Sequence, residues 1–220
     1  MLYFPHPLHD NKDGLIAVGG ELSSSRLLLA YQYGIFPWYS ESPILWWWLH
    51  PRCVMRPGEM KVSKSLNKTL KSKRFDITLN HDFGFVIEKC ASIRRQHQEG
   101  TWIINDMIHA YKAFHELGYA HSIEVWSEGQ IVGGLYGVAI GKIFFGESMF
   151  YEVRDASKVG LYWLSKLLVE HNFRLIDCQQ ETEHLISLGA FMMSKDDYWK
   201  EIRRNLLHFD SLSSLYQLSK

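Results

Sequence analysis

The chain has 220 residues, and its 24 Lys and Arg side chains equal its 24 Asp and Glu side chains in number. This length corresponds to one large domain or two small ones, and 46% apolar with 22% charged residues is typical of a soluble globular protein. The composition excludes disorder, collagen-like sequence and coiled coil, and the zero net charge means that any nucleic-acid footprint must be local.

Other classes are disfavoured by pattern. The longest weakly polar run, 131–141, is about half of the ~20 residues that a membrane helix needs. The first ten residues lack the basic-then-apolar order of a signal peptide, and three widely spaced cysteines indicate neither a disulfide framework nor a zinc site. We therefore expect a cytoplasmic protein with no metal and no membrane partner.

Residues 1–55 are predicted to form a small N-terminal α/β subdomain built on turns, one short helix and an extended tryptophan segment. Ser23 precedes the helical pattern, and Gly34 can end it. Trp46, Trp47 and Trp48 cannot all face one core on a strand, because alternate side chains point to opposite faces.

A basic helix is predicted next. Lys61, Lys64, Lys68 and Lys71 recur at steps of three, four and three, which places them on one helix face, and 60–74 contains no acidic residue. This face is either a solvated helix surface or a contact for an anionic partner such as a phosphate backbone.

The remaining pattern, over residues 56–220, predicts an α+β domain with one mixed β-sheet. Its order of elements resembles that of the GNAT acyltransferases in topology. The predicted helices are 83–94, 105–117, 156–171 and a helix or turn at 182–188, and the predicted strands are 122–126, 130–140, 143–150, 174–179 and 190–193. A hairpin turn is predicted at Glu128-Gly129.

One short strand is predicted to present an acid and an amide on the same face. Asp177 and Gln179 are two residues apart, and side chains at that spacing on a strand point the same way. Strand ends in sheets covered by helices often open onto a cleft. Asp177 is therefore either a strand-end residue that accepts backbone hydrogen bonds or part of an acceptor pair that positions an amine.

Glu147 lies in a strand-like stretch, 143–150, in which its neighbours are apolar or small. A carboxylate in such surroundings is costly without a partner. It is therefore either half of a structural ion pair or a site carboxylate that holds a cationic amine. Trp102, which follows a polar loop, is either a packed side chain or a stacking platform.

Several stretches, taken together, resemble the leucyl/phenylalanyl-tRNA–protein transferases over nearly the whole chain. The most specific of them are GIFPW (34–38), GESMF (146–150) and LIDCQ (175–179), and others are GLIAVGGELS (14–23), DASKVGL (155–161) and HLISLGA (184–190). The resemblance implies a GNAT-like catalytic domain without acyl-CoA chemistry and without a cofactor. Such enzymes move Leu or Phe, and Met less well, from aminoacyl-tRNA onto the N-terminal Arg or Lys of a protein. The product is a degradation signal in the bacterial N-end rule pathway.

The resemblance also implies roles for individual residues. Asp177 and Gln179 match the proposed catalytic pair of the family, and Glu147 matches its site glutamate. The positions that match its substrate-binding side chains are Trp38, Trp102, Leu135, Phe144, Leu164 and Ile176. The lysine face (Lys61, Lys64, Lys68 and Lys71) would contact tRNA phosphates.

A mechanism follows as a hypothesis. A tRNA ester is already activated, so the enzyme need only hold the amine near the carbonyl carbon and help to remove a proton. Asp177 would orient Gln179, whose carbonyl oxygen accepts a hydrogen bond from the attacking amine, without a covalent intermediate. However, strand alternation places Phe144 opposite Glu147, and Ile176 opposite Asp177, so both can line one site only at a bulge or a splayed strand end.

The chain departs from the family pattern at two places. Trp48-Leu49-His50 stands where the family usually has Ser-Pro-Asp, and Tyr151-Glu152 stands where it typically has Ser-Arg, with Arg154 two residues late.

Two rival functions remain. An acetyl-CoA N-acetyltransferase needs a glycine-containing turn before the long helix to bind the pyrophosphate. Residues 147–158 contain no glycine, which argues against this function. A non-catalytic tRNA-binding protein would explain the lysines but leave Asp177, Gln179 and Glu147 without a role. The length permits a monomer.

Overall fold

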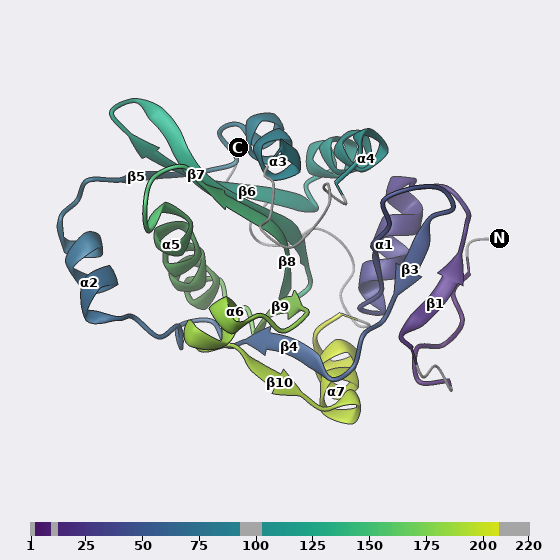
Figure 1. Cartoon of the computed structure of the whole chain (residues 1–220). Helices are drawn as coiled ribbons and strands as arrows, with labels where there is room; N and C mark the ends of the chain where they lie inside the picture. The colour runs from purple at the N-terminus through teal and green to yellow at the C-terminus, as the bar shows by residue number, and fades with distance from the viewer. Residues whose placement is uncertain (1–2, 10–12, 93–102, 207–220) are drawn as a thin grey trace.

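The computed structural model describes residues 3–9, 13–92 and 103–206. The N-terminal part holds a three-stranded antiparallel sheet, in which β3 (Leu45–Trp47) lies between β1 (Leu15–Val18) and β2 (Phe36–Pro37). Helix α1 (Ser24–Gln32) begins where Ser23 accepts a hydrogen bond from the Arg26 N–H at 3.3 Å. The predicted helix and extended tryptophan segment are therefore confirmed (Figure 1).

A seven-stranded sheet forms the rest of the molecule's centre, in the order β10-β4-β9-β8-β7-β6-β5. Its strands are β4 (Arg52–Met55), β5 (Asp76–Leu79), β6 (Ala120–Ser127), β7 (Gln130–Ile140), β8 (Ile143–Tyr151), β9 (Leu175–Gln179) and β10 (Phe191–Met193). Only β8 and β9 pair in parallel, and the other neighbours in this sheet are antiparallel. The α+β class with one mixed sheet is confirmed.

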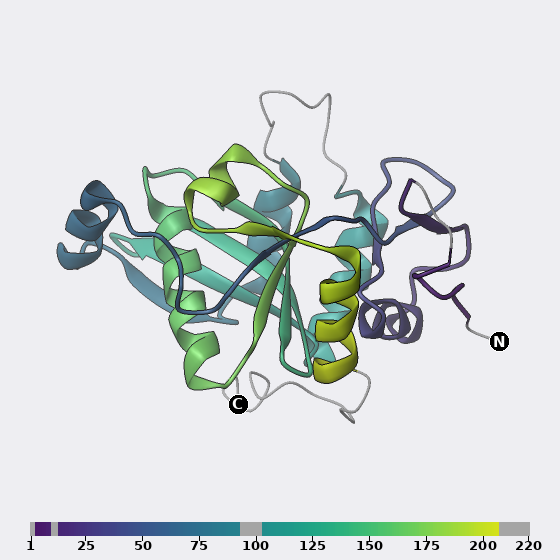
Figure 2. The same ribbon diagram turned by 90° about the horizontal axis from the view of Figure 1, so that it is seen from below.

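Helices cover both faces of this sheet (Figures 1 and 2). They are α3 (Phe83–Ser92), α4 (Asn105–Glu116), α5 (Ala156–Glu170), α6 (Glu183–Ser187) and α7 (Lys195–Asn205). Helix α2 (Lys64–Lys71) packs against α5 at the side of the molecule (Figure 1). Strand alternation divides the core: Leu135 and Ala139 of β7 pack in the cluster that contains α5, whereas Tyr136 and Val138 pack in the cluster that contains α3 and α4.

The sequence-based elements agree well with the structure, with one correction. Helix α2 begins only at Lys64, because Ser63 has an extended backbone and accepts a hydrogen bond from the Leu66 N–H at 3.1 Å. Lys61 lies before this cap, and its N–H donates to the Leu188 carbonyl at 2.8 Å. The prediction that Lys61 shares a helix face with the other lysines is wrong.

Strands β4 and β5 were not predicted from the sequence, because four-residue strands carry little periodicity. Helix α7 was not predicted either. The division of the chain at residue 55 stays a prediction. Strand β4, at the end of the predicted N-terminal part, pairs with β9 and β10 in the large sheet.

Candidate active site

A cavity of about 380 Å³ opens where the two parallel strands part. Strand β8 pairs with β9 only as far as Phe145 and Asp177, and beyond this point the two strands diverge. The cavity is lined mainly by apolar side chains, with a carboxylate and an amide at its wall. Its lining includes Phe36, Trp38, Leu135, Phe144, Glu147, Leu164, Ile176, Cys178 and Gln179.

A β-bulge places Glu147 at this cavity. Tyr136 of β7 pairs with Ser148, but the next residue, Gly137, pairs with Gly146, so Glu147 is the extra residue of β8. The bulge allows Glu147 and Phe144 to line one cavity, although simple alternation would separate them. The bulge that the sequence analysis required for this pair is therefore present.

Glycine is required beside the bulge. A Cβ at Gly137 would lie 2.2 Å from the Phe145 carbonyl oxygen and 2.5 Å from the Phe144 ring. Because the Phe144 ring lines the cavity, any side chain at Gly137 would displace part of the cavity wall.

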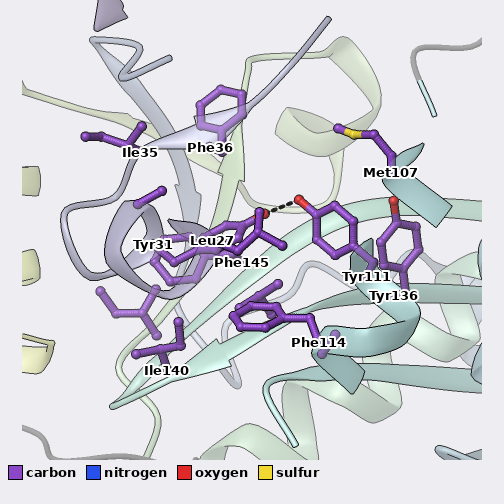
Figure 3. Close-up of a cluster of buried hydrophobic side chains, with 14 of the residues drawn as sticks. Leu27, Tyr31, Ile35, Phe36, Met107, Tyr111, Phe114, Tyr136, Ile140 and Phe145 are labelled. Carbon is purple, nitrogen blue, oxygen red and sulfur yellow. Dashed lines mark hydrogen bonds between the residues drawn. The ribbon is translucent and has the colours of Figure 1, made fainter. Parts of the chain in front are cut away.

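Glu147 is held by a network of neutral donors. The Tyr31 hydroxyl donates to Oε1 at 2.7 Å, the Tyr111 hydroxyl donates to Oε2 at 3.3 Å, and the Gln179 amide Nε2 donates to Oε1 at 2.9 Å. The two tyrosine hydroxyls are also within hydrogen-bond reach of each other, as Figure 3 shows, so their two protons are shared among three contacts. Among the described residues Glu147 has no ion-pair partner, so they give no support to the predicted alternative of a structural ion pair.

This environment changes the acidity of the carboxyl group. Burial raises the pKa of Glu147 from an ordinary value of 4.5 to about 7, although the hydrogen bonds that it accepts lower it. The charge of Asp177 adds to the rise. Burial also raises the pKa of Tyr31 and of Tyr111 well above 10, so both remain neutral donors. Glu147 can therefore gain or lose a proton near neutral pH.

Gln179 has a left-handed backbone conformation, with φ of 61°. For a residue other than glycine this conformation costs roughly 1–2 kcal/mol. The cost is offset by Asp177, because its Oδ1 accepts the Gln179 N–H at 2.9 Å. The prediction that Asp177 accepts a backbone hydrogen bond at a strand end is therefore confirmed. This bond also fixes the position of Gln179.

Asp177 is itself fully buried in an ion pair. Arg52 Nε lies 2.9 Å from Oδ1 and 3.1 Å from Oδ2, and Nη2 lies 2.9 Å from Oδ2. The Tyr198 hydroxyl donates to Oδ2 at 2.5 Å. Arg52 Nη2 also donates to the Gly34 carbonyl at 2.9 Å, which ties the N-terminal part to the site. Burial lowers the pKa of Arg52, but Asp177, Tyr198 and Glu147 together raise it by more, so the guanidinium stays charged.

Most of the residues expected at the site are brought together. Trp38, Leu135, Phe144, Leu164 and Ile176 line the cavity together with Glu147 and Gln179. Asp177 lies behind the wall rather than in it, and Trp102 lies outside the described residues. Lys64, Lys68 and Lys71 are exposed on α2, and their roles stay predictions.

Four residues of the site were missed by sequence reasoning: Tyr31, Tyr111, Arg52 and Tyr198. Each belongs to an element distant in sequence from Glu147 and Asp177, so spacing could not link them. One available signal was Arg52, a single charge beside the apolar run Cys53-Val54-Met55.

The two departures from the family pattern lie away from the cavity wall. Trp48 is buried and its Nε1 donates to the Tyr33 carbonyl at 3.0 Å, so it supports the N-terminal part. Glu152 pairs with Lys89 at 2.6 Å, and the side chain of Arg154 is 85% exposed. Arg154 is not among the residues that line the cavity.

None of the helices in the part of the chain that the structure describes is long and apolar enough to cross a membrane. No group of three or more His, Cys, Asp or Glu side chains within 3–9, 13–92 and 103–206 is arranged to hold a metal ion.

The fold and the cavity suit an acyltransferase that holds an apolar acyl side chain beside hydrogen-bonding groups. Residues 54–203 match the family model of the leucyl/phenylalanyl-tRNA protein transferases, and residues 20–48 match the model of their N-terminal domain. A leucyl/phenylalanyl-tRNA–protein transferase of Solidesulfovibrio magneticus is 51% identical over 200 residues, which cover 90% of this chain and 81% of the relative. One of Syntrophobacter fumaroxidans is 50% identical over 206 residues, which cover 93% and 88%. The chain belongs to the leucyl/phenylalanyl-tRNA–protein transferase family, whose members are aminoacyltransferases.

Solved structures show only a distant likeness. A GCN5-related N-acetyltransferase-like protein from Streptococcus suis has a TM-score of 0.36 and 13% identity, covering 75% of this chain and 62% of its own. L-PGS from Bacillus licheniformis has a TM-score of 0.41 and 10% identity, covering 70% and 56%. At these scores neither adds to the fold described above.

Proposed function

We propose that this chain transfers Leu or Phe, and Met less well, from aminoacyl-tRNA to the N-terminal Arg or Lys of a protein. The observation that carries the proposal is the apolar cavity with Gln179 and Glu147 in its wall, in a member of this family. We further propose that it acts as a monomer. A tRNA substrate supports a cytoplasmic location.

The cavity is the proposed pocket for the transferred side chain. Leu135, Phe144, Leu164 and Ile176 supply an apolar wall of branched and aromatic groups. Such a wall accepts Leu and Phe, and it rejects β-branched side chains by shape, through differences of ~1–3 kcal/mol. Trp38 lines the cavity on the side of the N-terminal part; its backbone N–H donates to the Leu45 carbonyl at 2.9 Å, and its ring packs edge-on against Trp47.

Gln179 is proposed to position the attacking amine. Its Nε2 is committed to Glu147, so its amide oxygen points away from Glu147 and can accept a hydrogen bond from the α-amine. The amine nitrogen then attacks the ester carbonyl carbon, and the new peptide bond forms as the bond to the ribose oxygen breaks. The proton lost by nitrogen ends on that oxygen. No covalent enzyme intermediate is needed.

Glu147 and Asp177 are proposed to act through Gln179. An ionised Glu147 can only accept hydrogen bonds, so it forces the NH₂ side of the amide toward itself. Asp177 fixes the left-handed backbone of the same residue through its N–H. Together they hold the amide oxygen in one place before the amine arrives.

The experiment that tests this function is transfer of labelled Leu from charged tRNA to peptides that begin with Arg or with Met. We expect label on the Arg peptide only, and sharply reduced transfer in Asp177→Asn and Gln179→Ala. Asp76→Asn, an exposed acid at the start of the edge strand β5, is the matched control and should keep full activity. Binding of tRNA without any transfer would instead leave a non-catalytic tRNA-binding protein.

The exposed lysines of α2 are proposed to contact tRNA phosphates. Leu66 anchors α2 in the same core cluster as the cavity residues, so the helix lies on the face of the sheet where the cavity opens. Replacing Lys64, Lys68 and Lys71 together by Ala should weaken tRNA binding and flatten its salt dependence, since each phosphate contact on a single strand contributes a slope of about 0.7. Lys200→Ala on α7 is the control, because Lys200 pairs with Asp197 there. An unchanged salt slope in the triple variant would refute the proposed contact.

A further inference from the structure

Two cysteines lie on adjacent strands beside the cavity, Cys178 in its wall and Cys53 behind that wall. Cys53 of β4 pairs with Gln179 of β9, and the next pair is Val54 with Asp177, so Cys178 is an extra residue in β9. At such a bulge two residues of one strand oppose one residue of its partner. Cys178 and Gln179 therefore both face Cys53, at the spacing of neighbouring antiparallel strands, which is the range that a disulfide spans.

The two thiols influence each other's acidity. Cys178 lowers the pKa of Cys53, whereas Cys53 and burial raise the pKa of Cys178. The Cys178 thiol donates a hydrogen bond to the Ile176 carbonyl at 3.9 Å. Cys53 is thus the more readily ionised of the two, and Cys178 must lose its proton before it can react.

The two cysteines differ in their access to the cavity. Cys178 lines the cavity, whereas Cys53 is fully buried behind it. The third cysteine, Cys90 of α3, packs in the core cluster on the other face of the sheet. A small oxidant in the cavity therefore meets Cys178 first, with Cys53 beside it and Cys90 out of reach.

We propose that Cys53 and Cys178 form an oxidation site for peroxides, in which a reversible disulfide distorts the cavity wall and stops transfer. The Cys178 thiolate attacks one oxygen of hydrogen peroxide, and hydroxide leaves as a sulfenic acid forms. The Cys53 thiolate then attacks that sulfur, the S–S bond forms, and a second hydroxide leaves. The two hydroxides take up the two thiol protons, so one peroxide is reduced to two waters and two thiols lose two electrons.

The consequence for transfer rests on the function proposed above. Cys178 lies between Asp177, which fixes the Gln179 backbone, and Gln179 itself. A bond from Cys178 to β4 pulls the bulge toward Cys53 and changes the strand end that carries Gln179. Displacing a positioned group by about 1 Å can cost on the order of a hundredfold in rate.

The test treats the purified full-length protein with hydrogen peroxide. We expect a mass loss of about 2 Da, one titratable thiol remaining after denaturation, and transfer reduced ~tenfold or more. A dithiol reductant should restore all three thiols and the activity. The oxidation should run faster at pH 9 than at pH 7, because the thiol that reacts first has a raised pKa.

Variants separate the pair from the third cysteine. Cys90→Ala should oxidise and lose transfer like the wild type. Cys53→Ala should keep basal transfer and resist peroxide, without the 2 Da loss. Retention of all three thiols, a doubled mass from an intermolecular bond, or a disulfide with unchanged transfer would each overturn the proposal. Because the thiol count is read without any transfer assay, a protein inactive from the start would refute the proposed function and leave the oxidation site testable.

Discussion

Replacing Glu147 by Gln should stabilise the folded protein at neutral and alkaline pH while it abolishes transfer. The carboxyl group is only 6% exposed, so solvent screening does not reduce its effect. Its pKa is about 7 in the folded protein against an ordinary 4.5, and each pKa unit corresponds to about 1.4 kcal/mol. The unfavourable burial of the charge thus corresponds to about 3 kcal/mol.

The direction of the Glu147 pKa shift determines the pH range in which the substitution stabilises the protein. Because the folded-state pKa is raised, the stabilising contribution of the protonated carboxyl is complete below pH 4.5 and is lost as the pH rises through about 7. The amide that the substitution introduces does not titrate. The difference in unfolding free energy between Glu147→Gln and wild type should therefore be near zero at pH 4 and reach about 3 kcal/mol in favour of the variant at pH 8.

The assay is urea denaturation of both proteins at closely spaced pH values, with Glu116→Gln as the control on the exposed end of α4. All other titrating groups are shared, so their contributions cancel in the difference. The control should show a flat difference across the range. A Glu147→Gln variant less stable than wild type at pH 8 would show that the carboxylate stabilises the network of tyrosines, contrary to this reasoning.

Three further substitutions test the packing around the site. Arg52→Met leaves Asp177 buried without its cation and should lower the free energy of unfolding, measured by urea denaturation, by about 3–5 kcal/mol. Adding Asp177→Leu should regain most of this stability but not the transfer activity. Gly137→Ala should lower the free energy of unfolding, measured by thermal melts, by about 1–3 kcal/mol, because the new Cβ would lie 2.2 Å from a backbone oxygen. The control Gly84→Ala, in helix α3, should be neutral or stabilising in the same assay. Leu164→Ala enlarges the cavity and should raise transfer of Phe relative to Leu by ~tenfold in a competition assay. An unchanged ratio would place the transferred side chain elsewhere.

The strongly patterned elements could be predicted from the sequence, since their periodicity records which face is buried. Strand β7 was predicted with its observed ends, because turn residues flank it, and Glu128 and Gly129 adopt the positive φ values of a tight hairpin turn. Helix α5 ended one residue earlier than predicted. These elements set the sheet and its two faces.

The arrangement of the site could be predicted only in part. Alternation required a bulge for Glu147 to share a cavity with Phe144, but periodicity cannot tell which residue bulges. The partners of Asp177 were not predictable, because Arg52 and Tyr198 reach it from opposite ends of the chain through tertiary packing. Periodicity records local faces, and it carries no information on pairs so distant in sequence.

The position of β4 has a consequence for how the enzyme is made. Strand β4 ends at residue 55, but it lies between β9, which starts at residue 175, and β10, which starts at residue 191. During synthesis on the ribosome, Arg52 emerges long before Asp177, and their pairing must wait for the last quarter of the chain. Nascent chains interrupted before that point can expose the lysines of α2 without possessing Gln179. Transfer activity is thereby confined to chains whose translation has passed β9.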